Sequence, residues 1–278
     1  MSHEKCIENA SPQSVLREFL AYPLDDGGEI LARFAALPGA RYVCGSHRME
    51  RYVYVPGTRK DAILLVAHVD TVWDRNYAQT GKGSPVDFRD GKFVSSDSLA
   101  GIGADDRAGC ALLWLLRESG HGLLLLDGEE KGHFTGKFIR QEQKDLLREL
   151  NRYAYLLALD LPGEAFCHYH NIPITKKFSQ YIESAFGCRP MPRKFGSDLP
   201  YLLTNRCGAN LSIGVYCMHR QEEVLDLEQW MRLYGKLLGV LQQPQSTFRS
   251  RTLVRLCRYG EQKLKLLWSR IRTRGKAV

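Results

Sequence analysis

The sequence predicts an α/β fold, a three-layer α/β/α sandwich built around a mostly parallel central sheet. Several apolar runs have the length of a strand and no polar alternation, as expected for strands buried on both faces. Segments with helical character separate these runs, and alternating strands and helices are typical of this architecture. The runs are Ala62–Ala67, Leu123–Leu126, Tyr155–Leu159 and Asn210–Tyr216.

The first elements precede these runs. Ser11 is a candidate N-cap for an opening helix whose apolar face holds Val15, Phe19 and Leu20. A second helix is expected from about Gly28 to Leu37, followed by a pair of strands. The two strands are Tyr42–Cys44 and Tyr52–Val55.

Helices are expected between and after the apolar runs. One begins near Asp105 and extends to Glu118, and the polar stretch Lys137–Asn151 is predicted to be an exposed helix. The remaining helical segments are Phe178–Phe186, Ser197–Leu203 and a long one at Leu225–Leu241.

The composition fits a globular protein in the cytoplasm. The chain has 278 residues, of which 44% are hydrophobic and 25% charged, enough for a sizeable core. No apolar run approaches the ~20 residues of a membrane span, and the N-terminus lacks the pattern of a signal peptide. The eight cysteines include no CxxC pair, which favours free thiols in a reducing compartment over a cysteine-based zinc site.

The positive charge is concentrated in the last 30 residues. From Arg249 onward there are ten Lys or Arg residues and one acid, Glu261, whereas the whole chain carries only +8. Apolar residues recur there at helical spacing, which predicts a basic amphipathic helix at 249–278 beyond a single domain at 1–248. That helix either docks on the domain or contacts an anionic surface such as membrane, nucleic acid or an acidic partner.

Metal-type ligands follow the predicted strands. His68, Glu130, Asp160 and His219 each come just after an apolar run, and Asp105 opens a helix. Ligands of such sheets bind at the carboxyl ends of the strands, where these side chains would meet. Taken singly, each residue has an ordinary interpretation as a loop histidine, a turn residue or a helix cap. Together, five nitrogen and oxygen ligands predict a site for zinc, cobalt or manganese.

Two acidic neighbours suit the chemistry of such a site. Asp70 lies two residues after His68 and could accept the second imidazole N–H, which fixes the tautomer that a zinc ligand needs. Glu129 and Glu130 are adjacent at the end of a buried strand, where like charges require a cation. One can bind metal while the other takes a proton from water.

The order of motifs resembles the co-catalytic two-zinc exopeptidase superfamily of bacterial leucyl aminopeptidase, tripeptidase and glutamate carboxypeptidase. The resemblance covers about residues 14–243. It rests on AHVDTV at 67–72, GADDRAG at 103–109, GEEKG at 128–132, ALD at 158–160, GSD at 196–198 and NLSIGVYCMH at 210–219.

The resemblance implies two Zn²⁺ per chain, with Co²⁺ or Mn²⁺ as substitutes. His68 and Asp160 would bind one ion, Glu130 and His219 the other, and Asp105 would bridge them. Glu129 would be the general base towards a metal-activated water, and Asp70 would orient His68. The family often has a cis peptide after the bridging aspartate, which here is the Asp105–Asp106 bond.

The departures from the family pattern leave the ligands intact. Arg107 stands where lysine is common and Lys131 where an apolar residue is common. The stretch between Asp160 and His219 is too short for the lid or dimerisation domain of many relatives, so we expect a lidless fold.

The expected function is hydrolysis of amide bonds by an aminopeptidase or small-peptide exopeptidase, and Asp rather than Glu at position 160 favours this class within the family. The expected substrate is a short peptide or an N-acyl amino acid. Two alternatives are a deacylase or amidohydrolase on the same fold and a non-catalytic protein that binds through its basic tail. His168 and His170 are interpreted as loop histidines.

Overall fold

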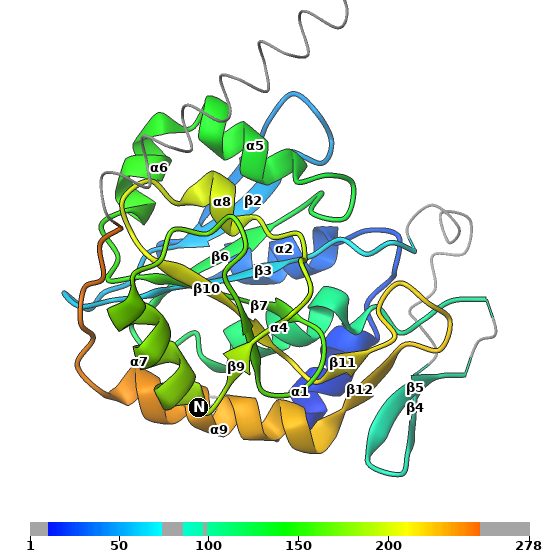
Figure 1. Cartoon of the computed structure of the whole chain (residues 1–278). Helices are drawn as coiled ribbons and strands as arrows, with labels where there is room; N and C mark the ends of the chain where they lie inside the picture. The colour runs from blue at the N-terminus through cyan, green and yellow to red at the C-terminus, as the bar shows by residue number, and fades with distance from the viewer. Residues whose placement is uncertain (1–10, 74–85, 97–98, 251–278) are drawn as a thin grey trace, which may run out of the picture.

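The computed structural model describes residues 11–73, 86–96 and 99–250, and its centre is an eight-stranded sheet. The four middle strands, β6, β3, β7 and β10, run parallel, whereas β2 and β8 join them antiparallel on either side. The predicted, mostly parallel sheet is therefore confirmed (Figure 1). In spatial order the strands are β1 (Arg41–Cys44), β2 (Arg51–Val55), β6 (Gly122–Leu126), β3 (Leu64–His68), β7 (Leu156–Leu161), β10 (Gly208–Ser212), β8 (Phe166–His168) and β9 (Arg189–Pro190).

Helices cover both faces of this sheet and make the three predicted layers (Figure 1). Alternate residues of a strand enter different cores, so Leu65 packs with one helical layer and Val66 with the other. One layer holds α1 (Pro12–Leu20), α2 (Gly28–Ala35), α4 (Ala104–Leu115), α7 (Lys176–Phe186) and α9 (Leu227–Gln242). The other holds α5 (Phe134–Gln141), α6 (Lys144–Leu150) and α8 (Leu199–Leu202).

A second, four-stranded antiparallel sheet was not predicted. It has the order β11 (Val215–Tyr216), β12 (Val224–Asp226), β5 (Lys92–Ser95) and β4 (Val86–Arg89). The predicted continuous strand Asn210–Tyr216 was wrong, because the chain turns at Gly214, with φ +83°, and continues in this second sheet. Phe93, Val215 and Leu225 join the core of the first helical layer, so both sheets share one interior.

Two predicted helices also differ from the structure. The single exposed helix at Lys137–Asn151 is two helices, α5 and α6, and both bury apolar side chains against the sheet. The predicted helix at Leu225 starts instead with β12, and the Asp226 side chain accepts a hydrogen bond from Gln229 N as the cap of α9. The predicted cap of α1 is confirmed, because Ser11 Oγ accepts from Ser14 N.

The stretch between Asp160 and His219 forms only parts of the two sheets and their helical layers, namely β8, α7, β9, α8, β10 and β11, without an inserted domain. The expected lidless fold is thus confirmed for a segment that is described throughout. Among the described residues, no helix combines the length and apolarity that a membrane span requires. The predicted basic helix lies almost entirely in 251–278, outside the described residues.

Candidate metal centre

The five predicted ligands converge at the carboxyl end of the parallel strands. His68 is the last residue of β3, Asp160 the penultimate residue of β7, and Glu130 lies in the loop after β6. Asp105 is at the start of α4. The position of His219 differs from the prediction, because it follows β11 of the second sheet rather than a strand of the main sheet.

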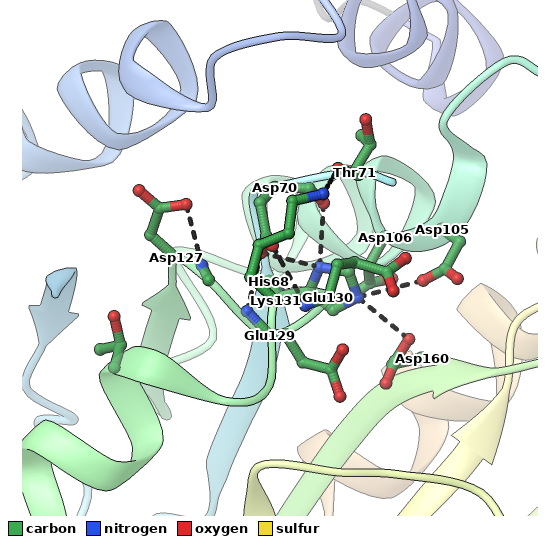
Figure 2. Close-up of polar contacts among 12 residues, drawn as sticks. His68, Asp70, Thr71, Asp105, Asp106, Asp127, Glu129, Glu130, Lys131 and Asp160 are labelled. Atoms are coloured by element: carbon green, nitrogen blue, oxygen red, sulfur yellow. Dashed lines mark hydrogen bonds and ion pairs between the residues drawn. The ribbon is translucent and has the colours of Figure 1, made fainter. Parts of the chain in front are cut away.

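The first ligand group contains His68, Asp105 and Asp160. His68 Nε2 lies 3.0 Å from Asp105 Oδ1 and 3.3 Å from Asp160 Oδ1 (Figure 2). His68 Nδ1 lies 3.0 Å from the backbone oxygen of Asp70, an acceptor. This contact accounts for a proton on Nδ1, so Nε2 is the nitrogen that would bind a metal ion beside the two carboxylates, as in a metal-binding histidine.

The second group contains Asp105, Glu130 and His219. His219 Nε2 lies 2.9 Å from Asp105 Oδ2 and 2.9 Å from Glu130 Oε1. Asp105 thus turns one carboxylate oxygen to each group, which is the arrangement of a bridging ligand. Glu130 Oε1 is buried and forms no hydrogen bond of acceptable geometry with the described residues, which leaves a lone pair for a cation.

The electrostatics of the site favour the binding of cations. Burial and the carboxylates of Asp105 and Glu129 raise the pKa of Asp160 well above its usual value. Burial, with Asp105 contributing, raises the pKa of Glu130 to about 7. Burial alone would lower the pKa of His68, but the surrounding carboxylates of Asp160, Asp105 and Asp70 raise it strongly. Bound cations would offset the negative charge of these buried, closely spaced carboxylates.

The chemistry of the donors fits two zinc ions. In each group, three ligand atoms lie within 4.8 Å of one another, and all are imidazole nitrogens or carboxylate oxygens. Three protein ligands per ion leave positions open for water and substrate, as in catalytic rather than structural zinc sites. Cobalt and manganese accept the same donors.

Asp70 links the first group to the loop that carries Glu129 and Glu130. Its carboxylate accepts hydrogen bonds from Glu129 N at 3.0 Å and from Glu130 N at 3.1 Å. Asp70 Oδ1 is 3.4 Å from His68 Nδ1, farther than the backbone oxygen of the same residue. The predicted contact with His68 is therefore made chiefly by the backbone of Asp70, while its side chain holds the GEE loop.

Glu223 supports the bridging carboxylate and was not predicted. Its buried side chain accepts hydrogen bonds from Gly103 N at 2.7 Å and Asp105 N at 3.1 Å. A Cβ at Gly101 would lie 2.6 Å from Glu223 Oε2, so the glycine leaves room for this side chain. Burial and Asp105 raise the pKa of Glu223 to about 8. In the sequence, nothing distinguishes this acid from the exposed Glu222 beside it.

Asp106 accepts hydrogen bonds from Gly109 N and His68 N, both at 3.1 Å, and so links the start of α4 to the end of β3. The Asp105–Asp106 peptide bond is cis, as the resemblance implied. Arg107 and Lys131, the two departures from the family pattern, donate to backbone oxygens of the surrounding loops.

Glu129 lies beside the centre but, among the described residues, belongs to neither ligand group. Glu129 Oε1 is 3.1 Å from Nδ1 of His133, a residue the sequence analysis did not single out. The same His133 nitrogen is 3.2 Å from Oδ1 of Asp198, the aspartate of the GSD motif. The site thus separates the two glutamates of the GEE motif into one that faces His219 and one that faces His133.

Comparisons with known proteins place this fold. No family model and no curated protein matches the sequence. Aminopeptidase PepT from Bacillus cereus is similar in structure with a TM-score of 0.57 and 14% identity, over 84% of this chain and 98% of that chain. A tripeptidase from Staphylococcus aureus gives a TM-score of 0.59 and 12% identity, over the same shares of 84% and 98%.

The TET1 peptidase from Pyrococcus horikoshii is also similar, with a TM-score of 0.57 and 12% identity over 83% of this chain and 99% of that chain. At such identities the likeness is one of fold. The fold that the motif resemblance implied is therefore confirmed.

Proposed function

We propose that this protein is a two-zinc metallohydrolase that cleaves amide bonds, and specifically an exopeptidase of the aminopeptidase type acting on short peptides. One observation carries the proposal: two three-donor groups share Asp105, and Glu129 lies beside them without belonging to either group. A shared carboxylate with an adjacent carboxylate base suits two-metal hydrolysis.

The residues divide the work. His68, Asp160, Asp105, Glu130 and His219 would hold the two ions. When bound, zinc supplies Lewis acidity, which lowers the pKa of water and polarises a carbonyl group. The Glu129 carboxylate accepts the proton of the attacking water and then donates it to the nitrogen of the leaving amine. Asp70 keeps Glu129 in reach through the hydrogen bond from Glu129 N.

The exopeptidase assignment has two supports besides the centre. The structural neighbours include an aminopeptidase and a tripeptidase by name. Asp160, rather than a glutamate, occupies the terminal ligand position, which favours aminopeptidase activity within the family that the motifs resemble.

The test combines metal analysis with a substrate panel. The protein reconstituted with zinc should bind two ions per chain and hydrolyse peptides with a free N-terminus. Glu129→Gln should keep the metal and lose turnover, whereas Glu130→Gln should lose metal. Glu222→Gln, at an exposed neighbouring acid, is the matched control and should behave as the unmodified protein.

Three results would overturn parts of the proposal. Less than one ion per chain after reconstitution rejects the two-zinc centre. Full activity of Glu129→Gln rejects Glu129 as the base. Hydrolysis of N-blocked but not of free-amine substrates rejects the aminopeptidase assignment in favour of a deacylase.

A further inference from the structure

Three ionisable side chains outside both ligand groups meet next to the centre. Glu129 comes from the loop after β6, His133 is the residue before α5, and Asp198 is the residue before α8. Their contacts converge on one atom, because His133 Nδ1 is 3.1 Å from Glu129 Oε1 and 3.2 Å from Asp198 Oδ1. Segments far apart in sequence therefore build a carboxylate–imidazole–carboxylate cluster.

The imidazole of this cluster is positively charged at neutral pH. Burial would lower the pKa of His133, but Asp198 and Glu129 outweigh it and raise that pKa to about 10. The Glu129 carboxylate also helps to raise the pKa of Asp198, whose side chain is 5% exposed, and a protonated ring between the two offsets that repulsion. The imidazolium lies within ion-pair distance of both carboxylates.

The surroundings fix the ring in place. A Cβ at Gly196 would lie 3.3 Å from His133 Cε1 and 3.6 Å from Glu129 Oε1, so only a glycine there leaves the cluster undisturbed. Gly136 of α5 also lies against the cluster. A Cβ there would be 2.5 Å from Asp198 Oδ1, so a larger residue would clash with this carboxylate. The Tyr201 ring packs 5.4 Å from the His133 ring.

We propose that His133, held by Asp198, is a positioning residue that orients the Glu129 carboxylate for proton transfer. This inference rests on the proposed function, in which Glu129 is the base. His133 engages one oxygen of the Glu129 carboxylate and thereby limits rotation of that group, which leaves the other oxygen to exchange protons with water and the leaving amine. A misplacement of about 1 Å in a catalytic group can cost ~100-fold in rate.

The inference predicts a specific kinetic pattern. His133→Asn should lower kcat by roughly 10- to 100-fold while KM and the number of bound ions stay unchanged. Asp198→Asn should have the same effect to a smaller degree, because the ring remains but loses its second partner. His133→Lys, which restores a cation at this place, should recover part of kcat. His170→Asn, at a partly buried histidine outside the cluster, is the control.

A double-mutant cycle separates positioning from an independent role. If His133 acts through Glu129, then His133→Asn should cause no further loss in a Glu129→Gln background, measured with a sensitive fluorogenic peptide. An equal loss in both backgrounds would overturn the inference, as would loss of metal from His133→Asn. Asp198→Asn provides the same cycle if His133→Asn does not fold.

The failure of this inference differs from that of the proposed function. If Glu129→Gln is inactive but His133→Asn keeps the kcat of the unmodified protein, only the positioning role is wrong. If Glu129→Gln is fully active, the base assignment is wrong, and the positioning role is rejected with it.

Discussion

Among the candidate ligands, Asp105 is the one that both groups share, because each of its carboxylate oxygens faces a different histidine. Oδ1 lies 3.0 Å from His68 Nε2 and Oδ2 lies 2.9 Å from His219 Nε2. Burial would raise the pKa of Asp105, but the two histidines outweigh it and hold that pKa well below its usual value. The charged carboxylate is thus available to both groups over the whole neutral range.

Substitution of single ligands should therefore have unequal effects on metal content. Asp105→Ala leaves two donors in each group, and we expect it to bind no ion firmly. His219→Ala leaves the first group intact, and we expect about one ion per chain to remain. Metal analysis after zinc reconstitution and dialysis measures both. Retention of one ion by Asp105→Ala would contradict the bridging role.

The charge of His133 should be visible in the pH dependence of stability. Its folded pKa, about 10, is above the ordinary value of 6.5, so folding favours the protonated ring. The contribution is therefore fully present below about pH 6.5 and is lost as the pH rises through about 10. The difference in free energy of unfolding between the unmodified protein and His133→Asn, both metal-free, should shrink across this window in urea titrations. If the difference in free energy of unfolding stays constant from pH 6 to 10.5, the raised pKa of His133 is contradicted.

The sequence indicates the ligands more readily than their supports. His68 and Asp160 were found because they end strands recognisable as apolar runs, and the carboxyl ends of parallel strands meet at one edge. Glu223 lies beside the exposed Glu222, and His133 lies in a loop outside any apolar run. Their roles arise from contacts with residues distant along the chain, namely Asp105 and Asp198, and no local pattern carries that information.

At the scale of elements, Arg107 connects α4 to the segment that follows α1. Its fully buried guanidinium donates to the backbone oxygens of Tyr22 and Pro23. Burial lowers the pKa of Arg107 to about 10, which leaves it charged at neutral pH. Because Asp105 is the second residue of α4, this contact also anchors the helix that presents the proposed bridging ligand.

Removal of this contact should destabilise the protein. Arg107→Ala leaves two partly buried carbonyl groups without their donor, and each hydrogen bond from a charged donor is worth about 1.5–3 kcal/mol, so we expect a loss of about 3 kcal/mol. Arg107→Lys should lose less, because an ammonium group can still reach one oxygen. Urea denaturation measures the free energy of unfolding, and exposed Arg152→Ala is the control. Equal stability of Arg107→Ala and the control would contradict this account.

The elements that could be predicted are those with a strong local pattern. The buried strands β3, β6 and β7 are continuous apolar runs, and α1 has both a cap and an apolar face. The short strands of the second sheet are two to four residues long, and partners from separate segments define them. The strands β4 and β5 have only four residues each, VDFR and KFVS, so their pattern is too short to predict a strand from the sequence.

At the scale of the whole molecule, the candidate centre joins five parts of the fold. Its ligands come from the ends of β3 and β7, the loop after β6, the start of α4 and the loop after β11. The smaller sheet matters for this reason, because it delivers His219 while packing into the same core as the main sheet. The unfolded chain has no such arrangement of donors, so metal binding and folding should be coupled.

Zinc should therefore raise the thermal stability of the protein. A ligand that binds only the folded state stabilises it by about 4 kcal/mol at a free concentration of 1,000 times Kd. For a protein of this size each kcal/mol corresponds to roughly 2–4 °C, so Tm should rise by about 10 °C on reconstitution. Differential scanning calorimetry with and without a chelator measures this shift. Asp105→Ala should show little or no zinc-dependent change, because neither group keeps three donors. If zinc raises the Tm of Asp105→Ala by the same amount, then zinc binds elsewhere, for example to the free cysteines, and not at the candidate centre.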